Sequence, residues 1–288
     1  MRQECDMLSG RRFHIEKVKP FGAILQSDNA GASIHNLDAA ELRSLLRENQ
    51  LLVLRGFASV PNRKCLIQFS QSLGEISMWP FGEVLELVEQ RSPEDHIFDN
   101  NYVPLHWDGM YRPHVPEIQV FQCVRAPEES HGGETTFSNT RMVLERMTKA
   151  EVSSLRAVSA YYERNMEYYQ SKTLAPIVNS HPEFGFDVIR YCEPPETGDK
   201  SFINHPGFEL RGLDRDNVTE FQQKLKEELY FEENFYAHKW QTDDVVLSDN
   251  YTLLHGRNKF TSGCSRHLRR VHVLGLPALK NPHLLEHQ

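Results

Sequence analysis

Two histidines and one aspartate are the residues of this chain whose types and spacing could bind a metal ion. His106 and Asp108 belong to a His-Trp-Asp tripeptide, and His255 lies far downstream. Two imidazoles and one carboxylate can hold one face of an octahedral Fe(II) and leave three positions open for chemistry. Residues two apart on a strand point to the same side, so His106 and Asp108 could act together. His255 can join them only in a fold that brings distant segments together.

A His-x-Asp pair is a weak signal by itself, because the chain has 14 histidines and most such pairs are surface accidents. The segment after His255 adds an independent signal, since it contains Arg266, Arg269 and Arg270. A guanidinium can grip a carboxylate through two parallel hydrogen bonds. We therefore expect Arg266 to bind the far carboxylate of a cosubstrate such as 2-oxoglutarate, and Arg269 to be solvated.

Apolar periodicity predicts the elements that must position these residues. We expect helices over residues 36–49, 62–73 and 218–230, each with an apolar stripe on one face. Thr148 and Glu151 match a capping box, which predicts a fourth helix reaching residue 158. Strands are expected at residues 51–54, 84–88, 118–124, 184–191, 245–247 and 270–274. The metal motif falls in the proline-rich loop between the second and third of these strands, where a rigid scaffold could hold it.

The composition is that of an ordinary globular protein and argues against nucleic-acid binding. Of the 288 residues, 39% are hydrophobic and 25% are charged. The net charge of −8 argues against a partner rich in phosphates, which requires a basic surface. No internal repeat, low-complexity tract or linker interrupts the sequence, so a single domain over residues 1–288 is expected.

Cysteine usage and the missing apolar runs predict a cytoplasmic protein. There are five cysteines, an odd number, and no Cys-x-x-Cys, so we expect free thiols in a reducing compartment and no zinc site. The first residues lack the apolar core of a signal peptide. No apolar run is long enough to cross a membrane.

From about residue 21 to residue 275 the chain resembles the taurine dioxygenase (TauD)-like family of Fe(II)/2-oxoglutarate oxygenases. The resemblance rests on the triad described above, the stretches 132–136 and 244–250, and the pair Arg266 and Arg270. It implies an α+β or mainly β fold: a double-stranded β-helix, or cupin-like jelly roll, with flanking helices.

The same resemblance implies the cofactors and the residues that bind them. Fe(II) would be held by the triad, and 2-oxoglutarate by Arg266 and Thr135, with Arg270 near its C1 carboxylate and the substrate. Dioxygen would be the oxidant, and ascorbate a supporting reductant. Gly132 and Gly133 could form a plain turn or a turn that positions Thr135.

Longer stretches are similar to a narrower group, the PvcB-type isonitrile dioxygenases, which act together with an isonitrile synthase. These stretches are residues 79–90, 95–98, 100–111, 201–204 and 267–272. The implied substrate is a tyrosine-derived isonitrile, 2-isocyano-3-(4-hydroxyphenyl)propanoate. The implied reaction is desaturation across Cα–Cβ, with the carboxylate either kept or lost as carbon dioxide.

Four residues near the motif are candidates for the substrate pocket, and Arg270 is a candidate for binding the substrate carboxylate. An aromatic ring packs well on Trp79, Phe81 and Tyr102, and a thioether such as that of Met110 is favourable beside a ring. Trp79, Phe81 and Met110 could equally be ordinary core residues. An apolar pocket distinguishes poorly between similar rings, so the phenylalanine-derived isonitrile is expected to be tolerated and taurine to be inert.

Two other functions remain open from the sequence. The same iron site could hydroxylate another small carboxylate metabolite, which substrate-dependent succinate production would reveal. A metal-free jelly-roll binding protein is the third interpretation, and stoichiometric Fe(II) binding would exclude it. A homo-oligomer is compatible with all three.

Overall fold

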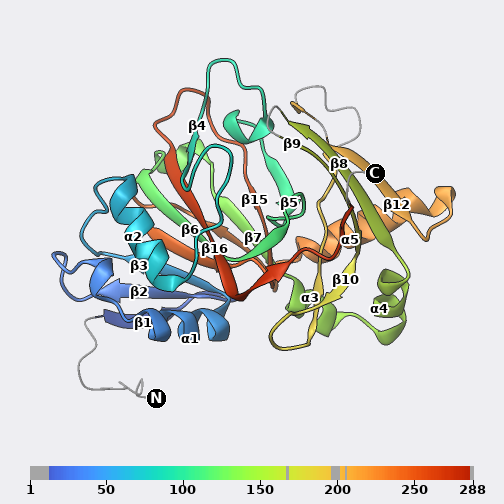
Figure 1. Ribbon diagram of the computed structural model, residues 1–288, viewed down its shortest axis with the longest axis horizontal. Helices are drawn as coiled ribbons and strands as arrows, with labels where there is room; N and C mark the ends of the chain where they lie inside the picture. The colour runs from blue at the N-terminus through green and yellow to red at the C-terminus, as the bar shows by residue number, and fades with distance from the viewer. Residues whose placement is uncertain (1–12, 167–168, 196–201, 205, 286–288) are drawn as a thin grey trace.

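The computed structural model describes residues 13–166, 169–195, 202–204 and 206–285, and most of its elements are strands with helices packed outside them (Figure 1). The α-helices are α1 (Ala39–Asn49), α2 (Arg63–Leu73), α3 (Thr140–Arg146), α4 (Lys149–Arg156) and α5 (Val218–Leu229). The strands are β1 (Phe13–Lys17), β2 (Ala23–Ser27), β3 (Leu51–Arg55), β4 (Leu85–Val88), β5 (Val103–His106), β6 (His114–Arg125), β7 (Thr135–Asn139), β8 (Ser159–Met166), β9 (Tyr169–Pro176), β10 (Val178–Ser180), β11 (Asp187–Ile189), β12 (Gly207–Arg211), β13 (Phe235–His238), β14 (Val245–Asp249), β15 (Leu253–Arg257), β16 (His267–Lys280) and β17 (Leu284–Leu285).

Two of the sheets form the expected jelly roll. The larger has the strand order β1-β2-β3-β14-β6-β16-β4, and the smaller has the order β13-β7-β15-β5. Their inner faces share one apolar cluster, to which β6 contributes Phe121, β7 Phe137, β14 Val246 and β15 Leu253. Strands that are distant in sequence, such as β5 and β15, are antiparallel neighbours. This arrangement brings the two halves of the metal motif together.

Alternation along β16 decides which of its side chains reach the space between the two sheets. Val271 and Val273 pack with the helical layer, whereas Leu268 belongs to the cluster between the sheets. Side chains two apart on a strand share a face. Arg270 and His272 therefore lie on the inner face with Leu268, next to the metal motif.

Helices cover the sheets at two ends of the molecule. In Figure 1, α1 and α2 lie beside β1, β2 and β3, while α4 and α5 lie at the opposite end with β8, β9 and β12. Leu42 and Phe69 anchor α1 and α2 on the large sheet. A separate cluster, which includes Trp107, Tyr162 and Leu225, joins α5 and the sheet β12-β8-β9-β17 to the region of the metal motif.

The predicted helices are present, and capping side chains explain where their ends differ from the expectation. Helix α1 begins at Ala39 rather than at residue 36, because the Asp38 carboxylate accepts a hydrogen bond from the Glu41 amide. Asn62 precedes α2 as its cap rather than forming its first turn. The capping box of Thr148 with Glu151 is confirmed, and α4 ends at Arg156 instead of residue 158.

Two strand expectations need correction. The segment 184–191 is mostly irregular, and only β11 (Asp187–Ile189) is a strand, paired with β10. The metal motif does not lie wholly in a loop, because its first histidine ends β5. The other five predicted strands lie within or overlap β3, β4, β6, β14 and β16, and the segment 118–124 is part of the longer β6.

Cys65, Cys123, Cys192 and Cys264 are free thiols, as expected, while Cys5 lies outside the described residues. Among the helices of the described ranges, none combines the length and the apolar character that crossing a membrane requires.

A buried ion pair ties β3 to the start of β14. Arg55 donates from Nε to one oxygen of Asp244 at 2.8 Å and from Nη2 to the other at 2.6 Å, and His238 Nε2 lies 3.2 Å from the second oxygen. Burial alone would raise the pKa of Asp244, but the hydrogen bonds from Arg55 and His238 hold it below its ordinary value. The carboxylate therefore contributes stability above the pKa of an unfolded aspartate and loses it as the pH falls through the lower folded pKa.

Asp244→Asn should lower the free energy of unfolding by about 3 kcal/mol at pH 7, because it leaves Arg55 without its buried partner. The difference from the native protein should shrink below about pH 4, where the native carboxylate also takes up its proton. Urea titrations at several pH values measure both effects. Asp243→Asn, at the neighbouring residue, is the control and should change little. An equal loss at pH 7 and pH 3 would contradict the electrostatic account.

Candidate active site

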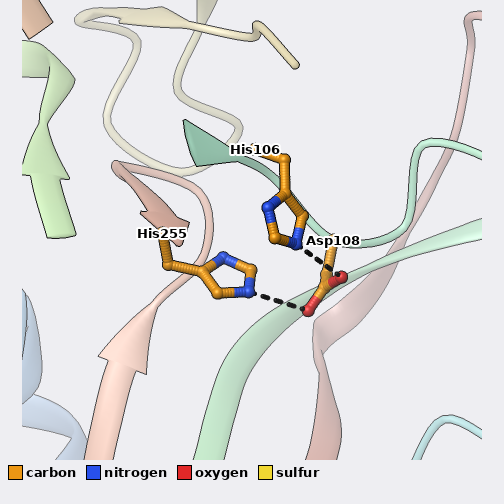
Figure 2. Close-up of side chains that lie close together, drawn as sticks. All are labelled: His106, Asp108 and His255. Carbon is orange, nitrogen blue, oxygen red and sulfur yellow. Dashed lines mark ion pairs between the residues drawn. The ribbon is translucent and has the colours of Figure 1, made fainter. Parts of the chain in front are cut away.

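His106, Asp108 and His255 lie together at the end of the small sheet, as the sequence predicted. His106 is the last residue of β5 and pairs in register with His255 of β15. Asp108 lies beyond the end of β5, so a turn places it rather than the strand alternation assumed from the sequence. Figure 2 shows the three side chains pointing toward one another. One donor atom from each lies within 4.8 Å of the others, which is the reach of a shared metal ion.

The Asn250 amide fixes the turn that carries Asp108. Its Oδ1 accepts a hydrogen bond from the Asp108 amide at 2.9 Å, and its Nδ2 donates to the Asp108 carbonyl at 2.9 Å and to the Pro116 carbonyl at 2.8 Å. Asn250 is fully buried. Its role is thus to hold the backbone of a candidate ligand.

Both candidate imidazoles are held in the form that metals bind. His106 Nδ1 lies 2.8 Å from the Pro104 carbonyl, which can only accept, so Nδ1 carries the proton and Nε2 presents its lone pair. Nε2 faces Asp108 Oδ1 at 3.9 Å. Burial lowers the pKa of His106 and holds that of His255 well below the ordinary value, so both rings stay neutral near pH 7.

Asp108 Oδ2 is the point at which the site's hydrogen bonds converge. Arg270 Nη1 and His272 Nε2 each lie 2.8 Å from it, and Gln119 Nε2 donates to it at 2.6 Å. Burial alone would raise the pKa of Asp108, but the charges of Arg270 and the nearby histidines hold it well below the usual range. The group is therefore a carboxylate before any metal arrives, as a hard ligand for Fe(II) must be.

Trp79 is linked to the Asp108 carboxylate through His272. Its indole Nε1 donates to His272 Nδ1 at 3.0 Å. Since that nitrogen accepts, the proton of His272 must be on Nε2, which then donates to Asp108. The Trp79 ring stacks on Phe81 with centroids 5.6 Å apart. Trp79 is thus more than a core residue or an apolar contact surface, because its indole orients His272, which in turn hydrogen-bonds Asp108.

Arg266 is a buried cation without a carboxylate partner among the described residues. Only 5% of it is exposed, and its Nε donates to the Gly133 carbonyl at 2.9 Å. Burial lowers its pKa to about 9. A Cβ on Gly133 would lie 2.9 Å from Arg266 Cδ, and Gly133 has a φ of +85°, so glycine is needed for this approach. The unpaired guanidinium fits an anion such as the far carboxylate of 2-oxoglutarate.

Thr135 begins β7, and its hydroxyl can still donate a hydrogen bond. Its buried Oγ1 accepts from Trp240 Nε1 at 3.0 Å, so the hydroxyl proton is available to donate to an anion. Arg269 does not face the space between the sheets as Arg270 does, and it is not solvated as predicted. It contacts Glu86 at 3.1 Å, and His267 contacts the same carboxylate at 2.5 Å.

A cavity of about 530 Å³ opens beside the three metal-binding candidates. Trp79, Phe81, Met110 and Arg270, which the sequence analysis named as candidate substrate contacts, are among the residues that line it. Tyr102 is not among the lining residues. Its ring centroid lies 6.4 Å from that of Phe202, and Phe202 does line the cavity. The predicted contact of Tyr102 with substrate stays a prediction.

The geometry agrees with the comparisons with known proteins. A family model described as taurine catabolism dioxygenase TauD, TfdA family matches residues 14–272. The chain belongs to this family. It is 48% identical to the tyrosine isonitrile desaturase of Pseudomonas aeruginosa, over 92% of this chain and 91% of that protein. It is 45% identical to the tyrosine isonitrile desaturase of Erwinia amylovora, again over 92% and 91%.

A solved structure of PvcB, described as an Fe, alpha-ketoglutarate dependent oxygenase from an isonitrile synthetic pathway, is also similar. It has a TM-score of 0.81 and 41% sequence identity, and the match covers 97% of this chain and 98% of that one. The jelly-roll fold expected for a TauD, TfdA member is thereby confirmed.

Sequence reasoning missed Gln119 and gave His272 no role. Gln119 lies on the inner face of β6, donates to Asp108 and accepts from Ser248 at 2.8 Å. The available signal was strand alternation: a polar residue between Ile118 and Val120 must face the opposite side from two core residues. The same reasoning applied to β16 would have placed His272 beside Arg270.

Trp79→Phe should weaken Fe(II) or Mn(II) binding by about 10- to 100-fold, the usual effect of removing a partner that orients a ligand. The substitution keeps a ring but removes the donor that fixes His272. Titration of the protein with Mn(II), followed by electron paramagnetic resonance, measures the affinity. Phe81→Leu is the matched control, because Phe81 lines the same cavity and its side chain has no hydrogen-bonding group. Equal affinities for native and Trp79→Phe protein would show that the connection does not reach the metal.

Proposed function

We propose that this protein is an Fe(II)/2-oxoglutarate-dependent oxygenase that desaturates the tyrosine-derived isonitrile 2-isocyano-3-(4-hydroxyphenyl)propanoate. The observation that carries the proposal is the meeting of His106, Asp108 and His255 on one side of a cavity large enough for an aromatic amino-acid derivative. Relatives of similar length named tyrosine isonitrile desaturase support the substrate.

In this proposal each residue of the triad supplies one ligand to Fe(II): His106 through Nε2, His255 through a ring nitrogen, and Asp108 through its carboxylate. Iron held by these residues would supply the oxidising chemistry, in which 2-oxoglutarate and dioxygen are consumed as hydrogen is removed from the substrate. The protein's contribution is to hold the reactants in place and exclude competing reactions. Ascorbate serves only to return iron to the ferrous state.

Arg266 and Thr135 hold the far carboxylate of 2-oxoglutarate. The guanidinium offers its two terminal nitrogens, because Nε is already used by Gly133. The Thr135 hydroxyl donates a further hydrogen bond, since its oxygen already accepts from Trp240. Arg270 holds the substrate carboxylate near iron. When Asp108 also binds a dication, its negative charge no longer fully balances the charge of Arg270, so Arg270 can bind a further anion.

The substrate ring lies in the cavity against Trp79, Phe81 and Met110. These side chains exclude water from the reacting carbons and fix the ring, so the Cα and Cβ hydrogens face the metal. The reaction uses one 2-oxoglutarate and one dioxygen. It yields succinate, carbon dioxide, water and the unsaturated isonitrile, with or without loss of the substrate carboxylate.

The substrate requires an isonitrile synthase upstream, so we propose that the protein works after such an enzyme. We also propose that it does so in the cytoplasm, where the four described thiols stay reduced. Cell fractionation with an antibody against the chain tests the location.

Desaturation predicts that no oxygen atom enters the product. With labelled dioxygen, the label should appear in succinate and water, while the product of tyrosine isonitrile loses two hydrogens, with or without carbon dioxide. Mass spectrometry of the product decides the question. A main product that is 16 mass units heavier before labelling, and that carries the label, would identify a hydroxylase. His255→Ala is the control, and it should abolish product formation and Fe(II) binding together while the protein stays folded.

Arg266→Ala should raise the 2-oxoglutarate concentration needed for half-maximal rate by about 10- to 1,000-fold. A charge-assisted contact in a buried site is worth roughly 2–5 kcal/mol when truncated, and 1.4 kcal/mol is tenfold. Initial rates of succinate formation measure the effect. Arg269→Ala is the matched control, since its guanidinium faces Glu86 instead. A larger change for Arg269→Ala than for Arg266→Ala would show that 2-oxoglutarate binds elsewhere than at Arg266.

A further inference from the structure

The cavity wall carries a second buried arginine–carboxylate pair besides Arg270 with Asp108. Arg164 of β8 forms an ion pair with Asp95, which precedes the short helix at residues 96–98. Only 10% of the Arg164 side chain and 2% of the Asp95 side chain are exposed. Both residues line the cavity that also contains His106 and Asp108. Burying two charges costs solvation energy, so a pair on a cavity wall calls for a functional explanation.

The contacts of Asp95 hold this pair rigidly. Its Oδ1 accepts a hydrogen bond from the Ile97 amide at 3.1 Å, which caps the short helix. Its Oδ2 accepts from Arg164 and from Asn204 Nδ2, the latter at 3.1 Å. The adjacent His96 ring stacks on Phe202 with centroids 4.2 Å apart, and both rings line the cavity. A fixed polar group is therefore bordered by aromatic surface.

The two pairs in the cavity differ in what they can bind. Once Asp108 ligates a dication, Arg270 has a charge that an anion can balance, so the substrate carboxylate belongs at that end. Arg164 and Asp95 remain balanced by each other, which gives a second anion little gain. Such a pair suits an uncharged group that can accept from a guanidinium and donate to a carboxylate. A phenolic hydroxyl has both capacities, and a phenyl ring has neither.

We propose that Arg164 and Asp95 form the subsite that recognises the para-hydroxyl group of the substrate. This inference rests on the proposed function, and it deepens it by naming which aromatic isonitrile the cavity prefers. It also differs from the expectation that an apolar pocket would hardly distinguish tyrosine-derived from phenylalanine-derived substrate. The ring lies between the two arginine–carboxylate pairs, with its carboxylate end at iron and its hydroxyl end at Arg164.

The expected preference is modest because the pair satisfies itself. Sites whose polar groups are left unpaired by the wrong substrate discriminate by factors of about 10⁴ or more. Here the phenylalanine-derived isonitrile leaves Arg164 and Asp95 still bound to each other. Only the hydrogen bonds to the hydroxyl are lost, which corresponds to about 10- to 100-fold in kcat/KM.

The test compares kcat/KM for the tyrosine-derived and the phenylalanine-derived isonitriles. The native enzyme should favour the tyrosine-derived substrate by about 10- to 100-fold, and this measurement needs no variant. Arg164→Leu should bring the ratio close to one by lowering only the rate with the tyrosine-derived substrate. The phenylalanine-derived substrate serves as the internal control for folding, and Arg211→Leu, at an exposed arginine of β12, should keep the native ratio.

Two results would overturn the subsite. One is a native ratio near one, with both substrates desaturated. The other is an Arg164→Leu enzyme that loses the same factor with both substrates, which would make Arg164 a structural residue. Either result leaves the desaturase function standing. Failure of the native enzyme to desaturate either substrate would instead overturn the proposed function.

Discussion

The arrangement of this site depends on one oxygen atom, Oδ2 of Asp108. A cation, an imidazole and an amide from two strands, β6 and β16, converge on it. These contacts keep the group ionised in a buried place and direct its other oxygen toward His106. Without them, a buried carboxylate would take up a proton and cease to be a ligand for a hard metal. The backbone of the same residue is held by Asn250, so both ends of Asp108 are fixed before iron or substrate binds.

The strands supply these partners through simple alternation. On β6 and β16, Gln119 and His272 each lie between two core residues that face the helical layer, so both point inward. Arg270 lies two positions from His272 and therefore shares its face. On β15, His255 follows the same rule between Leu254, which packs outward, and a glycine. A single period of two therefore separates the residues that stabilise the helical layer from those that do chemistry. A shift of register by one residue would exchange the two sets.

The sequence was sufficient for the three metal-binding candidates and the four main helices, because residue type and spacing encode them. It also singled out Arg266, whose binding of the cosubstrate is a proposal. It was insufficient for partners that depend on tertiary contact. Nothing near Trp79 in the sequence indicates that its indole reaches His272, and nothing near Asp95 indicates Arg164. The strands β8, β9 and β12 were missed, since their mixed composition gives no clear alternation of apolar and polar residues. Helix ends were misplaced where a capping side chain, such as that of Asp38, set the first turn.

Arg266 has a consequence for how the folded protein depends on its surroundings. A buried guanidinium without a carboxylate partner is held at a cost in solvation, which the rest of the fold must offset. An anion that binds there restores the lost electrostatic balance only in the folded chain. Any such ligand stabilises the native state in proportion to the logarithm of its concentration. With 2-oxoglutarate as the proposed anion, the protein's resistance to unfolding would rise with the concentration of its own cosubstrate.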